Sequence, residues 1–367
     1  MAKAKKNVID MDLFCSAKDA FEKEKNRTAL SVSPSIDLRL GGGILEGSFV
    51  LIQGKPKCGK SLTCMEIAVN ALKQGRWVIY FDTENRMTPS KYFIIEGFDI
   101  LNHKKFLLMN SESNKKGDIT SGDKMYGVIL QMMKSPKYKG AVFIIDSLSD
   151  VITQDVLDDP IVTSQRRDST PKLNADFCKK VGPYIKRANA ILVGVQHLQK
   201  DISPTGHGAL QPVGGDRLNY KCDIVLLSKH NPLNFEGKTI NGGFSKGDDA
   251  IDGLLIRYDL TANRILGPFV AKEPEEKIQN YYNFGRGCWW EKEALDVLKE
   301  IGLIMQGGAY YTFMTEKFSE RIQGTQKTLD LLKDNREYFT SVLQDYYRET
   351  YDVNFSFVQD DEASEEE

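Results

Sequence analysis

Short, nearly continuous apolar segments alternate with segments of helical periodicity through the first half of the chain. Apolar runs of this kind are typical of strands that are buried on both faces of a parallel sheet. Strands that alternate with helices predict an α/β fold built on a twisted, mainly parallel central sheet. The predicted strands are Phe49–Ile52, Trp77–Asp82, Lys105–Met109, Ala141–Ser147 and Ala190–Gln196.

Helices are predicted wherever apolar residues recur at intervals of three and four. The first, Asp12–Lys25, is short and amphipathic, so its apolar stripe must pack against its own domain or against a neighbouring subunit. A highly charged helical segment is expected over Glu316–Tyr347. The other predicted helices are Leu62–Leu72, Tyr126–Lys134, Asn174–Ala188 and Glu291–Ile301.

Weaker patterns complete the predicted fold. Leu30–Ser33 alternates like an edge strand, and residues 36–44 then lead through a three-glycine turn to the strand at Phe49. A hairpin is expected at Gly307–Phe313. Four further strands are expected as antiparallel additions to the sheet, at Cys222–Ser228, Gly253–Tyr258, Arg264–Val270 and Ile278–Phe284.

These patterns divide the chain into four regions. Residues 1–35 form an N-terminal arm and helix, 36–285 a core, and 286–358 a small C-terminal α/β domain. The tail 359–367 carries six acidic residues and no apolar anchor, so it is expected to be disordered. Its role is either solubility or competition with nucleic acid for a basic groove, and the sequence leaves both open.

The strand at Phe49 is followed by Gly54-Lys-Pro-Lys-Cys-Gly59-Lys60-Ser61 and then by a predicted helix. This context is that of a phosphate-binding P-loop. The two glycines let successive N–H groups converge on an anion, and the helix adds its positive end. Lys60 supplies a mobile charge for the β- and γ-phosphates, and Ser61 a hydroxyl ligand for Mg²⁺. The sequence therefore predicts a nucleoside triphosphate site.

Two further strand ends carry carboxylates. Asp146 follows a run of large apolar residues, the Walker B pattern in which a strand-tip carboxylate holds the water shell of Mg²⁺. Glu84 lies just beyond Asp82, at the edge of a parallel sheet where ligands bind. There it can orient an attacking water. The alternative is that Glu84 only caps a helix before Thr88-Pro89.

Gln196 and His197 end the strand that begins at Ala190. A polar pair at this edge can sense a γ-phosphate and pass its state to the loop that follows. It is equally open that Gln196 and His197 are ordinary polar residues at a strand end with no role in sensing phosphate.

Two long polar segments follow strand ends. Residues 198–215 contain four glycines and two prolines, and we expect a mobile loop there. Its Lys200 and His207 suit contact with a phosphate chain. Asp150–Pro171 is the second such segment, and loops of this length are usually functional or disordered.

Composition mainly excludes classes of protein. The chain has 41% hydrophobic and 27% charged residues, as in soluble globular proteins. It has no apolar run of membrane-spanning length and no signal-peptide core, so a cytoplasmic location is expected. Six cysteines without C-x-x-C spacing argue against a zinc site or a disulfide framework. The tail holds six of the 51 acidic residues, so the remainder, with 49 basic residues, is net positive and compatible with a polyanionic partner.

Taken in order, these motifs resemble those of the RecA recombinases, most closely the phage UvsX-like branch, over roughly residues 30–315. A Walker A loop alone is shared by very many ATPases. The Phe-Asp-x-Glu strand end, the Asp-Ser Walker B motif and a closing Gly-Gly pair together are much more selective. The matching segments are Leu40-Gly-Gly-Gly-Ile44, the P-loop, Tyr80-Phe-Asp-Thr-Glu84, Phe143-Ile-Ile-Asp-Ser147, Gly194-Val-Gln-His197 and Gly214-Gly215.

The resemblance implies a RecA-type P-loop ATPase core and a strand-exchange protein that forms helical filaments on single-stranded DNA. It implies DNA-stimulated hydrolysis of ATP to ADP and phosphate, with ATP and Mg²⁺ held between subunits and the N-terminal helix docked on the adjacent subunit. Double-stranded DNA, loading or mediator proteins and single-strand-binding proteins are further implied partners. The phage branch implies the cytoplasm of an infected bacterium, and no membrane partner.

The resemblance also assigns residues. Glu84 matches the water-activating glutamate, with Lys60 on the phosphates and Gln196 and His197 coupling the γ-phosphate to the DNA loops at 155–171 and 198–213. Arg264 is the candidate cation that acts on the neighbouring subunit, because bacterial members have two lysines where this chain has Ala262 and Arg264. The expected nucleotide residues are Gly54, Lys55, Pro56, Lys57, Cys58, Gly59, Lys60, Ser61 and Leu62; the Mg²⁺ residues are Ser61 and Asp146; the DNA residues are Arg166, Arg167, Lys200, His207, Gly214 and Gly215.

Two other functions stay open at this point. One is a hexameric DNA helicase with the same core fold, against which the absence of a large domain ahead of residue 30 argues. The other is a recombination accessory protein that binds DNA without catalysis. The intact Lys60, Ser61, Glu84 and Asp146 argue against the second.

Overall fold

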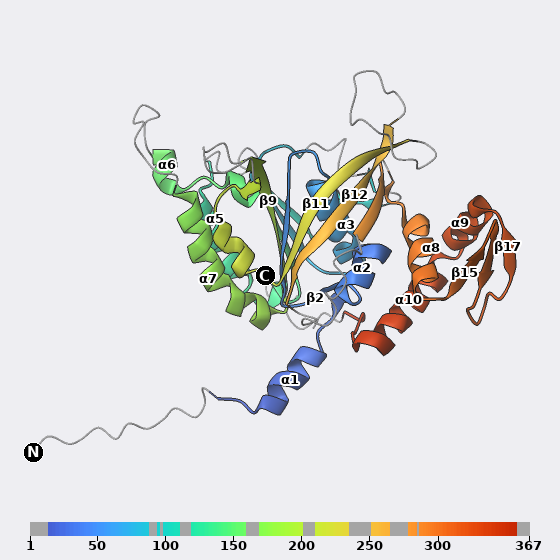
Figure 1. The fold of residues 1–367 in the computed structure, drawn as a ribbon. Helices are drawn as coiled ribbons and strands as arrows, with labels where there is room; N and C mark the ends of the chain where they lie inside the picture. Colours follow the sequence, from blue (N-terminus) through green and yellow to red (C-terminus); the bar gives the residue numbers. More distant parts are fainter. Residues whose placement is uncertain are drawn as a thin grey trace, which may run out of the picture.

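A ten-stranded sheet runs through the centre of the molecule, with helices on both of its faces (Figure 1). The computed structural model describes residues 14–87, 94–95, 98–110, 119–158, 169–200, 210–234, 251–264, 278–284 and 286–357. The strands are β1 (Ala29–Leu30), β2 (Ile44–Leu45), β3 (Phe49–Gly54), β4 (Val78–Asp82), β5 (Ile94–Ile95), β6 (Phe98–Asp99), β7 (Phe106–Asn110), β8 (Val142–Asp146), β9 (Ile191–Lys200), β10 (Leu210–Pro212), β11 (Ile224–Asn234), β12 (Ile251–Asn263), β13 (Ile278–Asn283), β14 (Gly287–Cys288), β15 (Ile304–Gly307), β16 (Tyr310–Phe313) and β17 (Arg321–Gln323).

The sheet is mostly parallel, as the sequence predicts. Its order is β14-β13-β12-β11-β3-β9-β8-β4-β7, and the strands from β11 to β7 all point the same way. β12, β13 and β14 extend the sheet with antiparallel pairs. The carboxyl ends of the parallel strands therefore share one edge. The register places Gly54 beside His197, and Asp82 beside Asp146.

Helices cover both faces of this sheet, and the sheet separates the apolar core into two clusters. Strand β3 shows the alternation, because Val50 and Ile52 face the cluster formed with α2 and α3, whereas Leu51 faces the cluster formed with α5 and α7. The described helices are α1 (Ala17–Lys25), α2 (Pro34–Leu40), α3 (Lys60–Lys73), α5 (Gly122–Met132), α6 (Gln154–Asp158), α7 (Thr170–Ala188), α8 (Trp290–Glu300), α9 (Thr325–Asp334) and α10 (Arg336–Tyr351), with short 3₁₀ turns η2 (Pro136–Tyr138), η3 (Leu148–Asp150) and η4 (Asp216–Tyr220).

Helix α2 occupies a segment in which the sequence predicted only a connection. A proline stands in its first turn, where a missing N–H is harmless, and Gly41 ends it in a left-handed conformation at φ 72°. Ile36 and Leu40 bury one face at a spacing of four residues. These signals were visible, but seven residues show no sustained period. The predicted edge strand Leu30–Ser33 is wrong beyond its first residue.

Strand β9 continues past its predicted end and pairs with β10. Lys200 lies opposite Leu210, and Leu198 opposite Pro212. The predicted loop 198–215 is therefore wrong at 198–200 and 210–212, which form strands. Backbone pairing between strands does not require apolar side chains. Residues 201–209, with His207, lie outside the described residues.

Two other boundaries also differ from the predictions. α7 begins at Thr170 instead of Asn174, because Pro171 is favourable in a first helical turn. β11 is parallel to β3, so the expectation of an antiparallel addition at Cys222–Ser228 is wrong. β12 is one strand that reaches Asn263, and residues 265–270 lie outside the described residues.

Residues 286–357 pack around a third apolar cluster, which includes Trp290, Phe313 and Phe339. Figure 1 shows α8, α9, α10 and the three-stranded sheet β15-β16-β17 beside α2. The predicted helix Glu316–Tyr347 is wrong in its first part, where the chain forms β17. The rest is helical but consists of two helices, α9 and α10, separated at Asn335.

The described N-terminal segment is much more exposed than the C-terminal region. α1 stands away from the sheet (Figure 1), and residues 14–20 are exposed. Across all described helices, none has the length and apolar character needed to cross a bilayer.

Candidate active site

The loop between β3 and α3 contains two glycines that its packing requires. Gly59 is left-handed at φ 86°, and a Cβ there would lie 2.3 Å from Cδ1 of Ile256. A Cβ at Gly54 would lie 2.5 Å from Sγ of Cys58 and 2.8 Å from the carbonyl oxygen of Ser228. Ser228 also donates its hydroxyl to the Cys58 carbonyl at 2.6 Å. The loop therefore curls tightly beneath the start of α3, whose free N–H groups favour an anion.

Lys60 opens α3, and its side chain folds back over the loop. Its Nζ donates to the carbonyl oxygens of Gly54 at 3.1 Å and Lys55 at 2.8 Å. The side chain is almost fully buried. An ammonium group held there can exchange a carbonyl partner for a phosphate oxygen. Of the other predicted nucleotide residues, Lys55, Pro56 and Lys57 are exposed, Leu62 is half-buried and Cys58 is buried.

Cys58 has a packing role. Its Sγ donates to the carbonyl oxygen of Lys55 at 2.8 Å, and the residue is only 2% exposed. Oxidation-sensitive thiols are accessible to solvent, so the burial of Cys58 indicates a packing residue and not a redox-sensitive one.

Asp146 ends β8 among hydrogen-bond donors. Its Oδ2 accepts the hydroxyl of Tyr80 at 2.8 Å, and its carboxylate also accepts a hydrogen bond from the Ser61 side chain. Burial raises the pKa of Asp146, and these two hydrogen bonds partly offset that effect. The hydroxyl of Ser61 and the Asp146 carboxylate are hard oxygen donors beside the P-loop, so the pair fits Mg²⁺.

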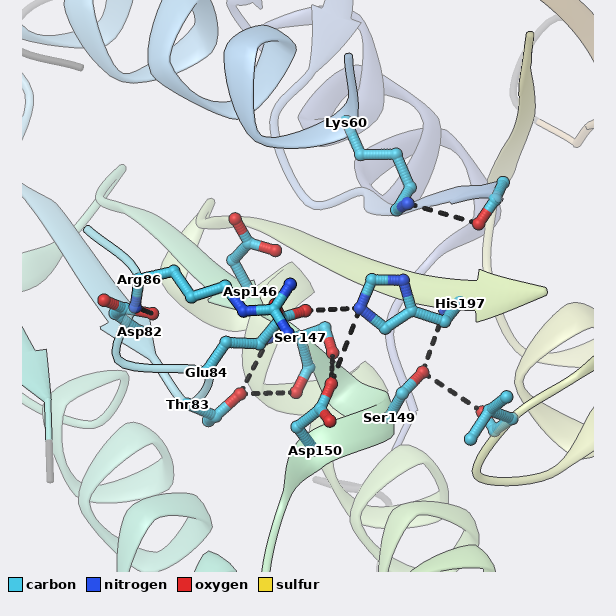
Figure 2. Close-up of polar contacts among 12 residues, drawn as sticks. Lys60, Asp82, Thr83, Glu84, Arg86, Asp146, Ser147, Ser149, Asp150 and His197 are labelled. Atoms are coloured by element: carbon cyan, nitrogen blue, oxygen red, sulfur yellow. Dashed lines mark hydrogen bonds and ion pairs between the residues drawn. The ribbon is translucent and has the colours of Figure 1, made fainter. Parts of the chain in front are cut away.

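Glu84 and His197 meet at the same edge of the sheet (Figure 2). Oε1 of Glu84 contacts Nε2 of His197, and Oε2 pairs with Nη1 of Arg86 at 2.9 Å. The hydrogen bond with His197 lowers the pKa of Glu84, so this carboxyl is held in its ionised form. The Glu84 side chain is 11% exposed. A sheltered carboxylate at this place can accept a hydrogen bond from water.

Asp82 binds the backbone directly after β4, and residues 88–93, where helix capping by Glu84 was the alternative, lie outside the described residues. Oδ1 of Asp82 accepts the backbone N–H of Arg86 at 3.3 Å, and its Oδ2 accepts that of Met87 at 2.8 Å. Asp82 therefore fixes the turn after β4, and both oxygens of Glu84 are directed to side chains instead.

Gln196 links the P-loop strand to the second long loop. Its Oε1 accepts the side-chain amide of Gln53 at 2.7 Å, and its Nε2 donates to the carbonyl oxygens of Val213 and Gly215, each at 2.9 Å. Gln196 is fully buried. The pairing of Gln53 with Gln196 follows from the register of β3 and β9, which was not visible in the sequence.

The turn after β8 supports the same region. Ser149 accepts the backbone N–H of His197 at 2.8 Å and donates to the carbonyl oxygen of Val213 at 3.3 Å. Asn174 donates to the carbonyl oxygens of Leu148 at 3.0 Å and Gly214 at 3.3 Å. Val213 and the predicted Gly214 are therefore linked to the turn that follows the Walker B strand, whereas Gly215 is held by Gln196 of β9.

Two cavities lie on this side of the molecule. One of about 420 Å³ is lined by Glu84, Arg86, Asp150 and their neighbours. The other, of about 440 Å³, lies between the start of α7 and the end of the second loop. Its lining includes Lys172, Asp176, Gly214, Gly215, Arg217 and Leu218.

Arg264 lies far from the P-loop of its own chain. It follows Asn263, which pairs with Ile224, and Ile224 pairs with Val50 at the start of β3. Its guanidinium donates to the carbonyl oxygens of Tyr220 at 2.5 Å and Asn219 at 3.2 Å. The structure thus brings Lys60, Ser61, Glu84, Asp146, Gln196 and His197 to one edge of the sheet and leaves Arg264 at the other.

The predicted DNA-binding residues other than Gly214 and Gly215 are either exposed or outside the described residues. Lys200 ends β9 and is exposed. Arg166, Arg167 and His207 lie outside the described residues. Sequence reasoning missed the polar partners of the site. For Gln53, Tyr80, Thr83, Ser149 and Asp150 the available signal was their position in or near predicted strand ends, whereas Asn174 lies on α7 and carried no such signal.

Comparison with known proteins agrees with this geometry. Residues 31–159, which contain the P-loop, Glu84 and Asp146, match the protein-family model described as "ATPase: KaiC". The chain is also similar to curated proteins named Protein RecA. That of Rippkaea orientalis is 21% identical over 342 residues, 92% of this chain and 88% of that protein. That of Streptococcus parasanguinis is 22% identical over 342 residues, 93% and 80% of the two chains. That of Oceanobacillus iheyensis is 22% identical over 348 residues, 94% and 89%. The chain therefore carries an ATPase domain of the KaiC/RecA type on a central, mostly parallel sheet.

Proposed function

We propose that this protein is a homologous-recombination ATPase that assembles as a helical filament on single-stranded DNA and exchanges strands. The phage UvsX-like branch of the RecA recombinases is the nearest group in this proposal, with an infected bacterial cell as its setting. Similarity to proteins named RecA over 92% of the chain supports it. The arrangement of side chains around the P-loop supports it independently.

The residues at the sheet edge have distinct roles in ATP hydrolysis. Lys60 leaves the carbonyl oxygens of the loop and binds the β- and γ-phosphates. Ser61 and Asp146 would hold Mg²⁺, which when bound would neutralise phosphate charge in the transition state. Glu84 accepts a hydrogen bond from the attacking water and orients it toward the γ-phosphate.

The observation that carries the proposal is the hydrogen-bonded chain through Gln196. It joins Gln53, next to the P-loop, to Val213 and Gly215 at the end of the second loop. His197, the next residue on β9, contacts Glu84. These polar contacts run from the P-loop strand and Glu84 to the loop, and such a connection suits an ATPase whose hydrolysis is coupled to a ligand of that loop.

We assign that ligand as single-stranded DNA. The 440 Å³ cavity beside Gly214 and Gly215 presents Lys172 from the first turn of α7 and Arg217 from η4. Cations, backbone groups and a helix start together favour phosphate oxygens. Arg166, Arg167, Lys200 and His207 complete the DNA contacts in this proposal, with double-stranded DNA bound during exchange.

The proposed filament explains two exposed features of the single chain. Residues 14–20, which include the start of α1, are exposed, and we propose that residues 1–35 dock on the adjacent subunit. Arg264 lies away from its own P-loop, and we propose that it binds the phosphates held by the neighbour. The core 36–285, the C-terminal domain 286–358 and an acidic regulatory tail 359–367 complete the arrangement. Loading and single-strand-binding proteins are proposed partners.

Electron microscopy with single-stranded DNA and a slowly hydrolysed ATP analogue tests the proposal, together with measurement of ATP hydrolysis with and without DNA. We expect open helical filaments and DNA-stimulated hydrolysis that is lost in Lys60→Ala. Lys186→Ala, at an exposed position near the end of α7, is the control. Closed rings would instead indicate a helicase, and DNA binding without hydrolysis an accessory protein.

A further inference from the structure

A second carboxylate lies opposite Glu84. Asp150 ends η3, and its Oδ2 lies 3.5 Å from Nε2 of His197, the nitrogen that Oε1 of Glu84 contacts. One ligand atom from each of the three side chains lies within 4.8 Å of the other two. A neutral imidazole carries one N–H. When this N–H is on Nε2, the two carboxylates compete for it.

The backbone that carries the two carboxylates is fixed. The N–H of Ser147 donates to Oγ1 of Thr83, and the Thr83 hydroxyl donates to the carbonyl oxygen of Ser147, both at 2.7 Å. Thr83 directly precedes Glu84, and Ser147 opens the turn that ends at Asp150. Ser147 also donates its hydroxyl to Oδ2 of Asp150 at 2.5 Å. The imidazole of His197 therefore lies between two acceptors whose backbones are held together by these hydrogen bonds.

His197 is in turn attached to the second loop. Its N–H donates to Oγ of Ser149 at 2.8 Å, and its carbonyl oxygen accepts the N–H of Val213 at 2.9 Å. Ser149 donates to the carbonyl oxygen of the same Val213. A small displacement of this end of the loop therefore changes the position of His197 relative to acceptors that are less than 4.8 Å apart.

Glu84 has both oxygens engaged in the described structure. His197 contacts Oε1 and Arg86 pairs with Oε2, so each oxygen already has one partner, and a water that binds Oε1 must compete with the imidazole. Asp150 is the more accessible acceptor, with a side chain that is 46% exposed against 11% for Glu84. Moving the imidazole to Asp150 therefore adds little desolvation cost and releases the sheltered carboxylate.

We propose that Asp150 is a positioning residue that takes His197 from Glu84 when bound DNA displaces the end of the second loop at Val213, and so frees Glu84 for the attacking water. This inference rests on the proposed function and specifies how DNA would stimulate hydrolysis at that site. Asp150 acts through His197 and does not itself contact ATP or the attacking water.

The kinetic test compares Asp150→Asn with Asp150→Glu on the full chain. The amide lacks the negative charge that attracts the imidazole, so we expect kcat with single-stranded DNA to fall about tenfold, within the usual range of coupling effects. KM for ATP and affinity for DNA are expected to stay within about twofold, because neither ligand touches Asp150. Asp150→Glu keeps the carboxylate and is expected to recover most of kcat. Asp345→Asn, on the exposed surface of α10, is the charge-matched control.

A spectroscopic readout separates positioning from a merely structural role. The chain has four histidines, so solid-state NMR of filaments with ¹⁵N-labelled histidine, assigned with His197→Gln, reports on the imidazole directly. We expect DNA and the ATP analogue to shift the Nε2 signal of His197 in the unmodified protein and in Asp150→Glu, but not in Asp150→Asn.

Three outcomes would overturn the inference. The first is full DNA stimulation in Asp150→Asn, and the second is an Nε2 shift that persists in that variant. The third is loss of the His197 signal on addition of Mn²⁺ without nucleotide, which would mean that the three side chains bind a cation. If the unmodified protein shows no DNA-stimulated hydrolysis, the proposed function fails. If it does, and Asp150→Asn retains that stimulation, only this inference fails.

Discussion

Gln53 and Gln196 are joined side chain to side chain across β3 and β9 at 2.7 Å, and both residues are buried. The amide group of Gln196 donates both of its hydrogens to the end of the second loop, at Val213 and Gly215. A displacement of Gln53 beside the P-loop can therefore be transmitted through the side chain of Gln196 to the end of the second loop, with no solvent between them.

Gln53→Leu is expected to uncouple ATP from DNA. The substitution removes the donor to Gln196 and leaves a buried oxygen without its partner, at a cost of about 1–3 kcal/mol. The contacts of Lys60 do not involve Gln53, so ATP binding should persist. We expect the increase in DNA affinity caused by the ATP analogue to shrink about tenfold. Fluorescence anisotropy with labelled single-stranded DNA measures it, with the exposed Gln131→Leu as the control. An undiminished effect of the analogue would contradict a role for this hydrogen bond.

Gly59→Ala tests whether packing as well as conformation requires glycine in the P-loop. Gly59 and Gly75 are both left-handed, at φ 86° and 79°, but only at Gly59 would an added Cβ meet other atoms within 4 Å. Alanine at Gly75 should cost about 1–2 kcal/mol from conformation alone. At Gly59 the clash with Ile256 should add about 1–3 kcal/mol. Calorimetry of the two variants measures the difference in midpoint. Equal shifts would show that the loop relaxes around the extra carbon.

The location of the site at the carboxyl edge of the parallel strands could be predicted from the sequence, because short apolar runs that end in polar residues mark that edge. Apolar runs that end in Asp146 or Gln196 predict parallel strands, and parallel strands bring their polar ends together. Lys60 and Ser61 were predicted for the same reason, since a P-loop is contiguous in sequence. Each of these features is fixed by residues that are close along the chain.

Contacts between distant segments could not be predicted in this way. The pairing of Gln53 with Gln196 depends on strand register, and the approach of Asp150 to His197 depends on the turn after β8. The β9–β10 ladder escaped prediction because its strength lies in backbone pairing and not in an apolar pattern. Neither register nor backbone pairing leaves a periodic signal in the sequence.

Stability should fall as the pH rises through neutrality, because two carboxyl groups are buried between α2, α8 and β13. Burial raises the pKa of Glu293 to about 7 and that of Asp37 to about 8. Each proton is bound more tightly in the folded chain than in the unfolded one, so this stabilisation is complete below about pH 4 and is lost as the pH rises through about 7–8. Glu66 of α3, whose pKa burial also raises, and Cys288, which contacts Glu293, face the same region.

Glu293→Gln is expected to flatten this pH dependence. The amide keeps the size of the side chain and stays neutral at every pH, so the fall in stability between about pH 5 and 7 should become shallower by up to about 1.4 kcal/mol per pH unit. Thermal unfolding at several pH values measures the slope. Glu300→Gln is the matched control, since Glu300 lies on the same helix in a partly exposed pair with Arg39. A slope that is the same in all three proteins would assign it to other groups.

Arg264 should complete the ATP site of a neighbouring subunit. In one chain it lies near the start of β3, whereas the P-loop begins after Gly54, four residues and about 13 Å farther along the strand. Arg264→Ala and Lys60→Ala are each expected to lose most DNA-stimulated hydrolysis. A random equal mixture forms head-to-tail interfaces of which about a quarter combine an intact P-loop with an intact Arg264, so activity should return to about a quarter of the unmodified level. If Arg264 instead served its own chain, every site in the mixture would carry one defect and no activity would return. Hydrolysis measured across mixing ratios therefore separates the two arrangements, provided that electron microscopy shows both variants in the same filaments.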